Sequence, residues 1–342
     1  MKKKEMVEAI GKVDPALKDG KLIEFAGLLI FDGKKLVSYG DDISVSVPLE
    51  TGFTAAVKAD EFSKLIQKIP GDDFEIELKD GQLVISAAGM KAGFSTVEFN
   101  EEAIPDWGQE QVKKWSKLTD NFTGNLRFCV FSASNDPSYG VLCNVKVEEE
   151  KLVSSDNYRI TESILPKKLP KMKQSLLIPR KIALFLSGFD LEKFAITDAC
   201  AHYQDKTGTV FTHRLIAEEY PDVSEHLDIE GSELKLPSTL TDALNRAKII
   251  VSSDGGTEQV EVFIEKDKVL IRGEGIDSWI EEPIKHKYDG DALHFVASPE
   301  HLVQILSYSN EAVIGENAIL FSGVNFRHAV CLFDVEGEEE KK

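Results

Sequence analysis

The sequence predicts an α+β protein in which one folding unit is used three times. The first observation is a hairpin-like phrase that recurs as KKLV at 34–37, EKLV at 150–153 and DKVL at 267–270. Its first apolar residues, Leu36, Leu152 and Val269, are separated by nearly constant intervals in the chain. Matched phrases at a fixed period are typical of a repeated structural unit. Each phrase also lies between β-rich segments, such as 260–264 before the third copy and 43–49 after the first.

A second shared phrase predicts a strand that runs into a helix. It reads VKADEF at 57–62, IPRKI at 178–182 and VASPEHL at 296–302. Pro179 and Pro299 stand where a first-turn proline is tolerated, and Ser298 is a suitable N-cap. Apolar residues then follow at helical spacing, as in Phe62, Leu65 and Ile66.

Each repeat is expected to open with a further helix, over about 4–13, 118–131 and 240–251. Strands follow the second helix, and the clearest pair is 74–78 and 83–85 around a turn at 79–81. The expected domains are therefore 1–112, 113–231 and 232–342, each with helices and antiparallel strands.

Composition narrows the function. The chain has 342 residues and a formal net charge of −19, which opposes a protein that grips nucleic acid with its whole surface. No apolar stretch approaches the roughly 20 residues of a membrane helix, so a soluble, cytoplasmic protein without membrane contact is expected. Four scattered cysteines, Cys129, Cys143, Cys200 and Cys331, have no metal-ligand spacing and are expected to be buried or half-buried thiols. We expect no metal and no cofactor.

Local phrases identify a resemblance to a known family. SSDNYRI at 154–160 is similar to the segment "ATDGHRL" of the bacterial DNA polymerase III β subunit, the β sliding clamp. LIPRK at 177–181 resembles its "IVPRK", and FTHRLI at 211–216 with YPD at 220–222 resembles "FTSRLIEGxFPDY". The resemblance covers nearly the whole chain and implies three clamp domains, each with two helices packed on antiparallel sheets.

The resemblance also implies a function. Two chains would form a head-to-tail homodimeric ring of six similar domains, which encircles double-stranded DNA without reading its sequence and tethers the replicative polymerase. Such a processivity subunit has no catalysis of its own. The alternative is a scaffold of the same fold that binds partner peptides without encircling DNA.

Peptides of the polymerase and the clamp loader would dock in a groove between the second and third domains. Carried over by position, that groove involves Leu142, Ser155, Asn157, Tyr158, Arg159, Ile160, Pro221, Leu227, Val330, Leu332 and Phe333. This chain departs from the family there, because Asn157-Tyr158 replaces Gly-His and VCLFD at 330–334 replaces the Met-Pro-Met-Arg end. The departures favour a divergent clamp, such as one carried by a phage or another mobile element, with a different partner motif. The acidic tail at 336–340 is expected to be a solvated end.

Ring closure explains how an acidic protein can act on DNA, since only the inner helices need basic residues. The predicted DNA-facing residues are Lys3, Lys4, Lys12, Lys64, Lys68, Arg127, Arg180, Lys181, Arg246 and Lys248. For dimerisation, the candidate edge strand is 93–99, with Phe94, Thr96, Val97 and Phe99 at the interface. Its partner is expected near 257–264 or the adjoining helix.

A serine acyl-enzyme is the enzymatic alternative. The chain contains S-D-N at 155–157, K-T-G at 206–208 and S-x-x-K at 232–235. The nucleophile motif comes last instead of first, and it precedes Pro237 in a segment that reads as strand or loop. We therefore set this interpretation aside.

Overall fold

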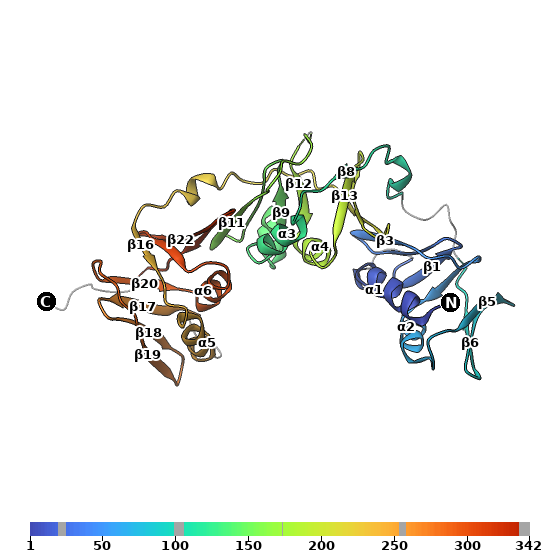
Figure 1. The fold of residues 1–342 in the computed structure, drawn as a ribbon, viewed down its shortest axis with the longest axis horizontal. Helices are drawn as coiled ribbons and strands as arrows, with labels where there is room; N and C mark the ends of the chain where they lie inside the picture. Colours follow the sequence, from blue (N-terminus) through green and yellow to red (C-terminus); the bar gives the residue numbers. More distant parts are fainter. Residues whose placement is uncertain (20–24, 99–105, 173, 253–257, 335–342) are drawn as a thin grey trace. The chain divides into compact units, whose positions relative to one another are not determined.

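The computed structural model describes residues 1–19, 25–98, 106–172, 174–252 and 258–334, and Figure 1 shows its ribbon. The chain divides into two compact units. Unit 1 comprises Met1–Thr123, Leu169–Lys171 and Lys181–Ala217; unit 2 comprises Gly124–Lys168, Met172–Arg180 and Glu218–Lys342. Each unit contains one eight-stranded antiparallel sheet and one smaller antiparallel sheet.

The large sheet of unit 1 has the strand order β4-β1-β2-β3-β15-β14-β13-β8. Its strands are β1 Leu28–Asp32, β2 Lys35–Tyr39, β3 Ile43–Pro48, β4 Thr54–Lys58, β8 Ser116–Lys117, β13 Leu191–Ile196, β14 Cys200–Asp205 and β15 Val210–Arg214. The small sheet is the meander of β5 Glu75–Lys79, β6 Gln82–Ala87 and β7 Met90–Ser95. Helix α1 (Lys3–Asp19) packs on β2 and β3 and beside α2 (Ala59–Lys68).

The large sheet of unit 2 has the order β12-β9-β10-β11-β23-β22-β21-β16. Its strands are β9 Asn144–Val147, β10 Lys151–Ser155, β11 Arg159–Ile164, β12 Leu176–Pro179, β16 Ser232–Lys235, β21 Glu311–Ile314, β22 Ala318–Gly323 and β23 Phe326–Cys331. The smaller sheet, β19-β18-β17-β20, contains β17 Val260–Glu265, β18 Lys268–Glu274, β19 Trp279–Lys285 and β20 Leu293–Ala297. The remaining helices are α3 Phe122–Val130, α4 Arg180–Leu186, α5 Leu240–Val251 and α6 Pro299–Leu306.

The predicted repetition is present in the strand order. The orders β4-β1-β2-β3, β12-β9-β10-β11 and β20-β17-β18-β19 are the same arrangement, and the recurring phrase lies at or beside the start of β2, β10 and β18. The meanders β5-β6-β7, β13-β14-β15 and β21-β22-β23 form a second repeated set. Each large sheet joins a four-stranded set to the meander of the following repeat. For this reason the two compact units do not coincide with the predicted domains 1–112, 113–231 and 232–342. The three-domain division stays a prediction.

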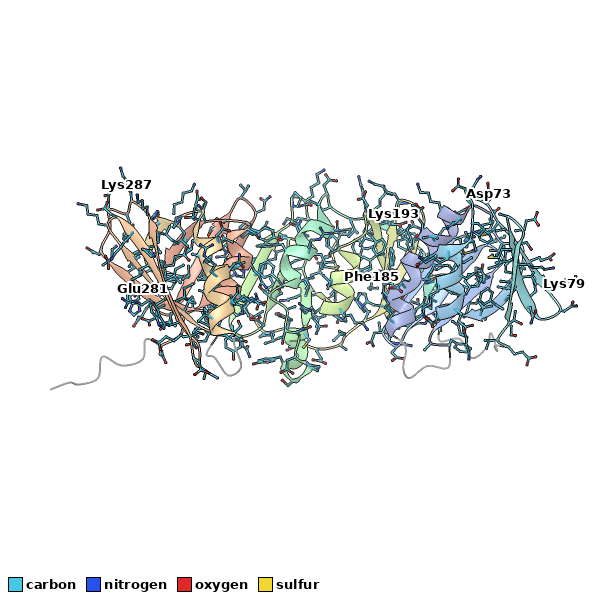
Figure 2. All side chains as sticks on the ribbon, turned by 90° about the horizontal axis from the view of Figure 1, so that it is seen from below. Asp73, Lys79, Phe185, Lys193, Glu281 and Lys287 are labelled. Carbon is cyan, nitrogen blue, oxygen red and sulfur yellow. The ribbon has the colours of Figure 1, made fainter. Side chains whose placement is uncertain are left out.

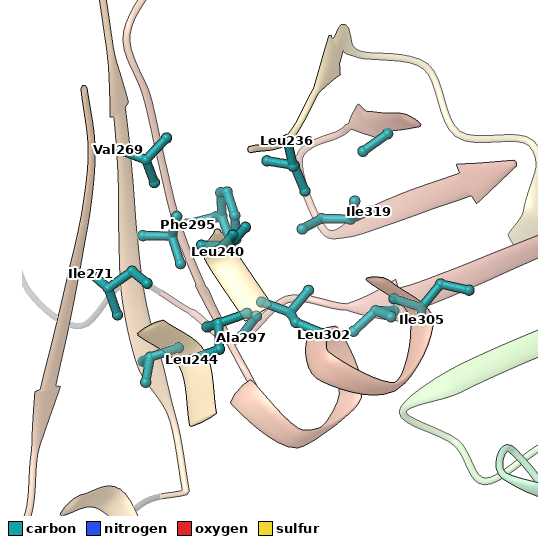
Figure 3. Close-up of a cluster of buried hydrophobic side chains, with 14 of the residues drawn as sticks. Leu236, Leu240, Leu244, Val269, Ile271, Phe295, Ala297, Leu302, Ile305 and Ile319 are labelled. Carbon is teal, nitrogen blue, oxygen red and sulfur yellow. The ribbon is translucent and has the colours of Figure 1, made fainter. Parts of the chain in front are cut away.

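The core of unit 2 shows why apolar periodicity marked the helices. Figure 3 shows side chains of α5, α6 and the neighbouring strands meeting in one cluster, which includes Leu240, Leu244, Leu302 and Phe295. Helices α5 and α6 pack against each other, and α5 packs on β18. Ser298 caps α6 as predicted, since its side chain accepts a hydrogen bond from the His301 backbone N–H. Burial of this cluster is the main stabilising contribution from these elements.

Every helix among the described residues is too short or too polar to cross a bilayer. The four cysteines are unbridged; Cys129 and Cys200 are buried and Cys143 is half-buried. Cys331 is exposed, so the expectation of a buried thiol is wrong there, because it lies near the end of β23, beyond the buried Val330.

Candidate functional site

The turn between β10 and β11 organises the predicted peptide site. Asp156 accepts hydrogen bonds from the backbone N–H groups of Tyr158 and Arg159, each at 3.1 Å. Asn157 has a φ of 73°, in the left-handed region that asparagine and glycine tolerate best. Glycine would adopt the same conformation without strain.

Arg159 connects this turn to α6. Its Nε donates to Asp156 Oδ2 at 2.8 Å, and its Nη1 donates to Gln304 on α6. The guanidinium also lies over the ring of Phe131, 5.6 Å from the centroid. Only 11% of the Arg159 side chain is exposed, so its charge serves mainly to position the turn.

An apolar cluster lies beside the turn. Its buried members are Ile160 of β11, Ala329 of β23, and Leu227, which lies in the segment between β15 and β16. The half-buried Val223, Ile229 and Leu320 pack against them. Tyr220 tethers the chain segment that supplies Leu227, because its hydroxyl accepts the Ser155 backbone N–H at 2.8 Å. The partly exposed members give this apolar cluster, as we name it, a surface on which apolar anchors could bind.

The structure brings only part of the predicted groove to the surface. Leu142, Ser155, Ile160, Leu227 and Val330 are buried. The side chains that reach solvent are those of Asn157, Tyr158, Arg159, Pro221, Leu332 and Phe333. Tyr158 is 46% exposed, with its ring 6.5 Å from that of His301. Leu332 packs against the larger core of unit 2 instead of the apolar cluster.

Sequence reasoning missed several residues of this region. Val223, Ile229, Leu320 and Ala329 complete the apolar cluster, and Gln304 holds Arg159. Val223 and Ile229 were within reach of sequence reasoning, since apolar residues embedded in an acidic segment need a burial partner. The strand partners Leu320 and Ala329 required the sheet topology.

Three buried polar side chains, those of Ser132, Thr161 and His328, form a hydrogen-bonded series next to the residues of the apolar cluster. The Thr161 hydroxyl lies 2.6 Å from the Ser132 hydroxyl and 2.8 Å from His328 Nδ1. Burial lowers the pKa of His328 well below its usual range, and burial and the nearby Arg159 charge lower the pKa of His301 to about 4. Both rings are therefore neutral near pH 7.

The predicted DNA-facing residues differ in how available their charges are. Five of them make ion pairs with carboxylates: Lys4–Glu8 at 3.8 Å, Lys12–Asp205 at 2.6 Å, Lys64–Asp60 at 2.6 Å, Arg246–Glu282 at 2.5 Å and Lys248–Glu300 at 3.1 Å. Lys12 is also bonded to the hydroxyls of Thr207 and Thr209, so it holds unit 1 together. Lys3 donates to the Ile69 carbonyl and Arg180 to Asn135. Lys68, Arg127 and Lys181 are exposed on α2, α3 and α4.

The predicted dimer edge, 93–99, overlaps strand β7 only at residues 93–95, and β7 is a terminal strand of its sheet. Thr96 and Val97 follow the strand, and their backbone N–H groups donate to the carbonyls of Gly81 and Ala56 within unit 1. Phe94 contacts Phe62 of the same unit, and Phe99 lies outside the described residues. Of the two partners expected, the strand near 257–264 offers no open edge, because β17 is paired on both sides, with β18 and β20. The adjoining helix stays a prediction. That sheet ends at β19 on one side and at β20 on the other; Figure 2 labels Glu281, an exposed side chain of β19.

The motifs of the acyl-enzyme interpretation do not assemble. Ser232 and Lys235 lie on strand β16, where residues three apart point to opposite faces. Across the part of the chain that the structure describes, no group of three or more His, Cys, Asp or Glu side chains could hold a metal ion.

Comparison with known proteins gives consistent relatives. The chain is 22% identical over 311 residues to the beta sliding clamp of Bacillus subtilis, covering 83% of this chain and 82% of that protein. It is 24% identical over 277 residues to the beta sliding clamp of Lactococcus lactis, covering 76% and 70%. No family model matches the chain.

Solved structures share the fold. The DNA polymerase III subunit beta of Pseudomonas aeruginosa matches with a TM-score of 0.82 and 16% identity, covering 98% of this chain and 99% of that one. The DNA polymerase sliding clamp of Bacillus subtilis matches with a TM-score of 0.81 and 19% identity over 98% of both chains. The predicted α+β fold class is confirmed.

Proposed function

Because this chain is a divergent member of the bacterial β sliding clamp family, we propose that it is a DNA sliding clamp. Two copies would close into a ring around duplex DNA and hold a DNA polymerase there through peptides bound at the apolar cluster. The protein would act by topology and binding, without catalysis of its own. The observation that carries the proposal is the repeated strand order, in which the edge strands β19 and β7 lack the partners that the equivalent strands have inside the chain.

The open edges are equivalent to edges that are paired inside the chain. β3 pairs with β15, and β11 pairs with β23. In each case the strand at one end of a four-stranded set, in spatial order, joins the third strand of the next meander. By the same pattern β19 lacks a following meander, and β7 lacks a preceding four-stranded set. A second copy placed head to tail would supply both partners, and two such contacts would close a ring.

The internal pairings also predict the register of this contact. β11 pairs with β23 so that Arg159 lies opposite Val330 and Ser163 opposite Phe326. The recurring phrase aligns β18 with β10, and therefore aligns their hairpin partners, β19 and β11. The two-residue hairpins align β7 with β23. Together these alignments place Ile280 opposite Phe94 and Ile284 opposite Met90. The less exposed faces of the two strands then coincide, as a shared sheet requires.

The register can be tested by cross-linking. In this alignment Ser95 of one copy lies opposite Trp279 of the other, and both side chains are exposed. We expect Ser95→Cys combined with Trp279→Cys, in a Cys331→Ser background, to form an intermolecular disulfide on mild oxidation, because directly opposite residues bring their Cβ atoms close together. Sedimentation should give about twice 38.0 kDa before and after oxidation.

The matched control is Ser95→Cys with Glu281→Cys, which is two residues out of register on the same face of β19. It should cross-link much less, since diagonal neighbours are too far apart for a disulfide. A persistent monomer, or equal cross-linking of both pairs, would contradict the proposed contact.

The charge distribution supports a second candidate, a scaffold of the same fold that binds peptides without encircling DNA. Half of the predicted DNA-facing cations already have carboxylate partners, which weakens any basic lining. Ring closure reduces the need for phosphate contacts, because a closed ring stays on DNA without high affinity. Retention on circular DNA separates the two candidates.

A further inference from the structure

Residues 218–230, which we name the acidic connector, have an unusual charge for a segment beside an apolar surface. This segment contains no lysine or arginine and one histidine, His226. Its six exposed carboxylates are Glu218, Glu219, Asp222, Glu225, Asp228 and Glu230. The same residues supply Val223, Leu227 and Ile229 to the apolar cluster. Any peptide bound on that cluster must therefore lie against negative charge.

Nearby cations of unit 2 neutralise only part of this charge, because they also pair with carboxylates outside the connector. Arg327 bonds to Glu162 at 2.8 Å and to Asp228 of the connector at 3.3 Å. Lys151 bonds to the same Glu162 at 2.8 Å, and Lys146 bonds to Glu148 at 2.5 Å. Glu162 is 3% exposed, so two cations compensate one buried carboxylate.

A cavity of about 680 Å³ lies beside the connector, and its lining carries only one more carboxylate than cations. Arg327 lines it and also contacts the connector through Asp228, so the cavity and the apolar cluster share one face of unit 2. Its lining includes the exposed Ile164 and the three paired cations Lys146, Lys151 and Arg327. It also includes the four glutamates Glu148, Glu149, Glu150 and Glu162. A long basic side chain has both apolar wall and carboxylates to contact there.

We infer that the partner peptide carries lysine or arginine beside its apolar anchors. This inference rests on the proposed function, since it assumes that the apolar cluster is the peptide site. Opposite charge raises the association rate and favours the complementary partner, whereas an acidic peptide meets like charge. Salt should screen the effect, because the connector carboxylates are exposed.

Three synthetic peptides test the inference. They share a Leu-Ala-Leu-Phe centre and are flanked by lysines, serines or glutamates, and fluorescence anisotropy measures their binding to the full chain. At low salt we expect the lysine-flanked peptide to bind at least about fivefold more tightly than the serine-flanked one, and the glutamate-flanked one most weakly. The difference should shrink to below about twofold in high salt.

A charge-neutral variant localises the effect. Glu225→Gln with Glu230→Gln should remove about half of the lysine-flank advantage and leave the serine-flanked peptide unchanged. These two were chosen because, within the described residues, their side chains make no ion pair. The control, Glu61→Gln with Glu77→Gln in unit 1, makes the same change in net charge and should keep the full advantage.

The outcomes separate the two proposals. Equal binding of the three peptides at low salt overturns the basic-partner inference and leaves the peptide site standing. Equal loss in both double variants also overturns it, since overall charge would then be the cause. Failure of all three peptides to bind overturns the peptide site itself, and the inference with it.

Discussion

Asn157 has its φ of 73° in the turn that shapes the peptide site. We expect Asn157→Gly to change the free energy of unfolding by less than about 0.5 kcal/mol, because glycine accepts this conformation. Asn157→Val should cost about 1–2 kcal/mol, since a β-branched residue is strained there. Urea unfolding measures both, and equal effects of the two substitutions would show that backbone strain does not control the turn.

Residue roles were only partly predictable from sequence. The family phrase falls on the turn between β10 and β11, where Tyr158 reaches solvent. Arg159 is expected to contact the peptide, and the structure adds that it bonds Asp156 and Gln304, which the sequence did not predict. Lys12 was expected at the DNA and instead bonds Asp205. A basic residue looks the same in sequence whether it faces solvent or a carboxylate that is distant along the chain.

At the scale of elements, β14 and β15 hold two buried histidines that make the stability of unit 1 depend on pH. Burial lowers the pKa of His202 and of His213 to about 4, from an ordinary value of 6.5. The unfolded chain therefore binds protons that the folded chain does not. Their contribution is constant above about pH 6.5 and falls as the pH drops towards 4, by roughly 2 kcal/mol per histidine at pH 5.

The measurement is urea unfolding at pH 7.5 and pH 5. We expect His213→Gln to lose less stability than the wild type between these two values, because one titrating group is gone. The exposed His226→Gln is the control and should behave like the wild type. Identical pH dependence in all three proteins would contradict the role of the buried rings.

Elements themselves followed from local signals. The helix expected over about 240–251 occurs as α5, and the strand-to-helix phrases at 57–62 and 296–302 lead into α2 and α6. The open edges were harder, since whether a strand is at an edge depends on which other strands pair with it. The segment 257–264 reads as a possible edge in sequence, yet β17 lies inside its sheet, which ends at β19 and β20.

At the scale of the whole molecule, ring closure lets a protein with a net charge of −19 stay on DNA without high affinity for phosphate. The repeated strand order makes closure by two copies a geometric expectation, since each copy ends in two complementary edges. The ion pairs of the predicted lining imply that retention should depend weakly on salt once the ring is closed.

Retention on DNA tests this claim most directly. The Ser95→Cys, Trp279→Cys chain in the Cys331→Ser background is oxidised in the presence of nicked circular DNA, and the complex is then passed through a sizing column in high salt. We expect the cross-linked protein to stay with the circle and to be released when the DNA is linearised. Release from intact circles, or equal retention on circular and linear DNA, would contradict a ring that encloses the duplex.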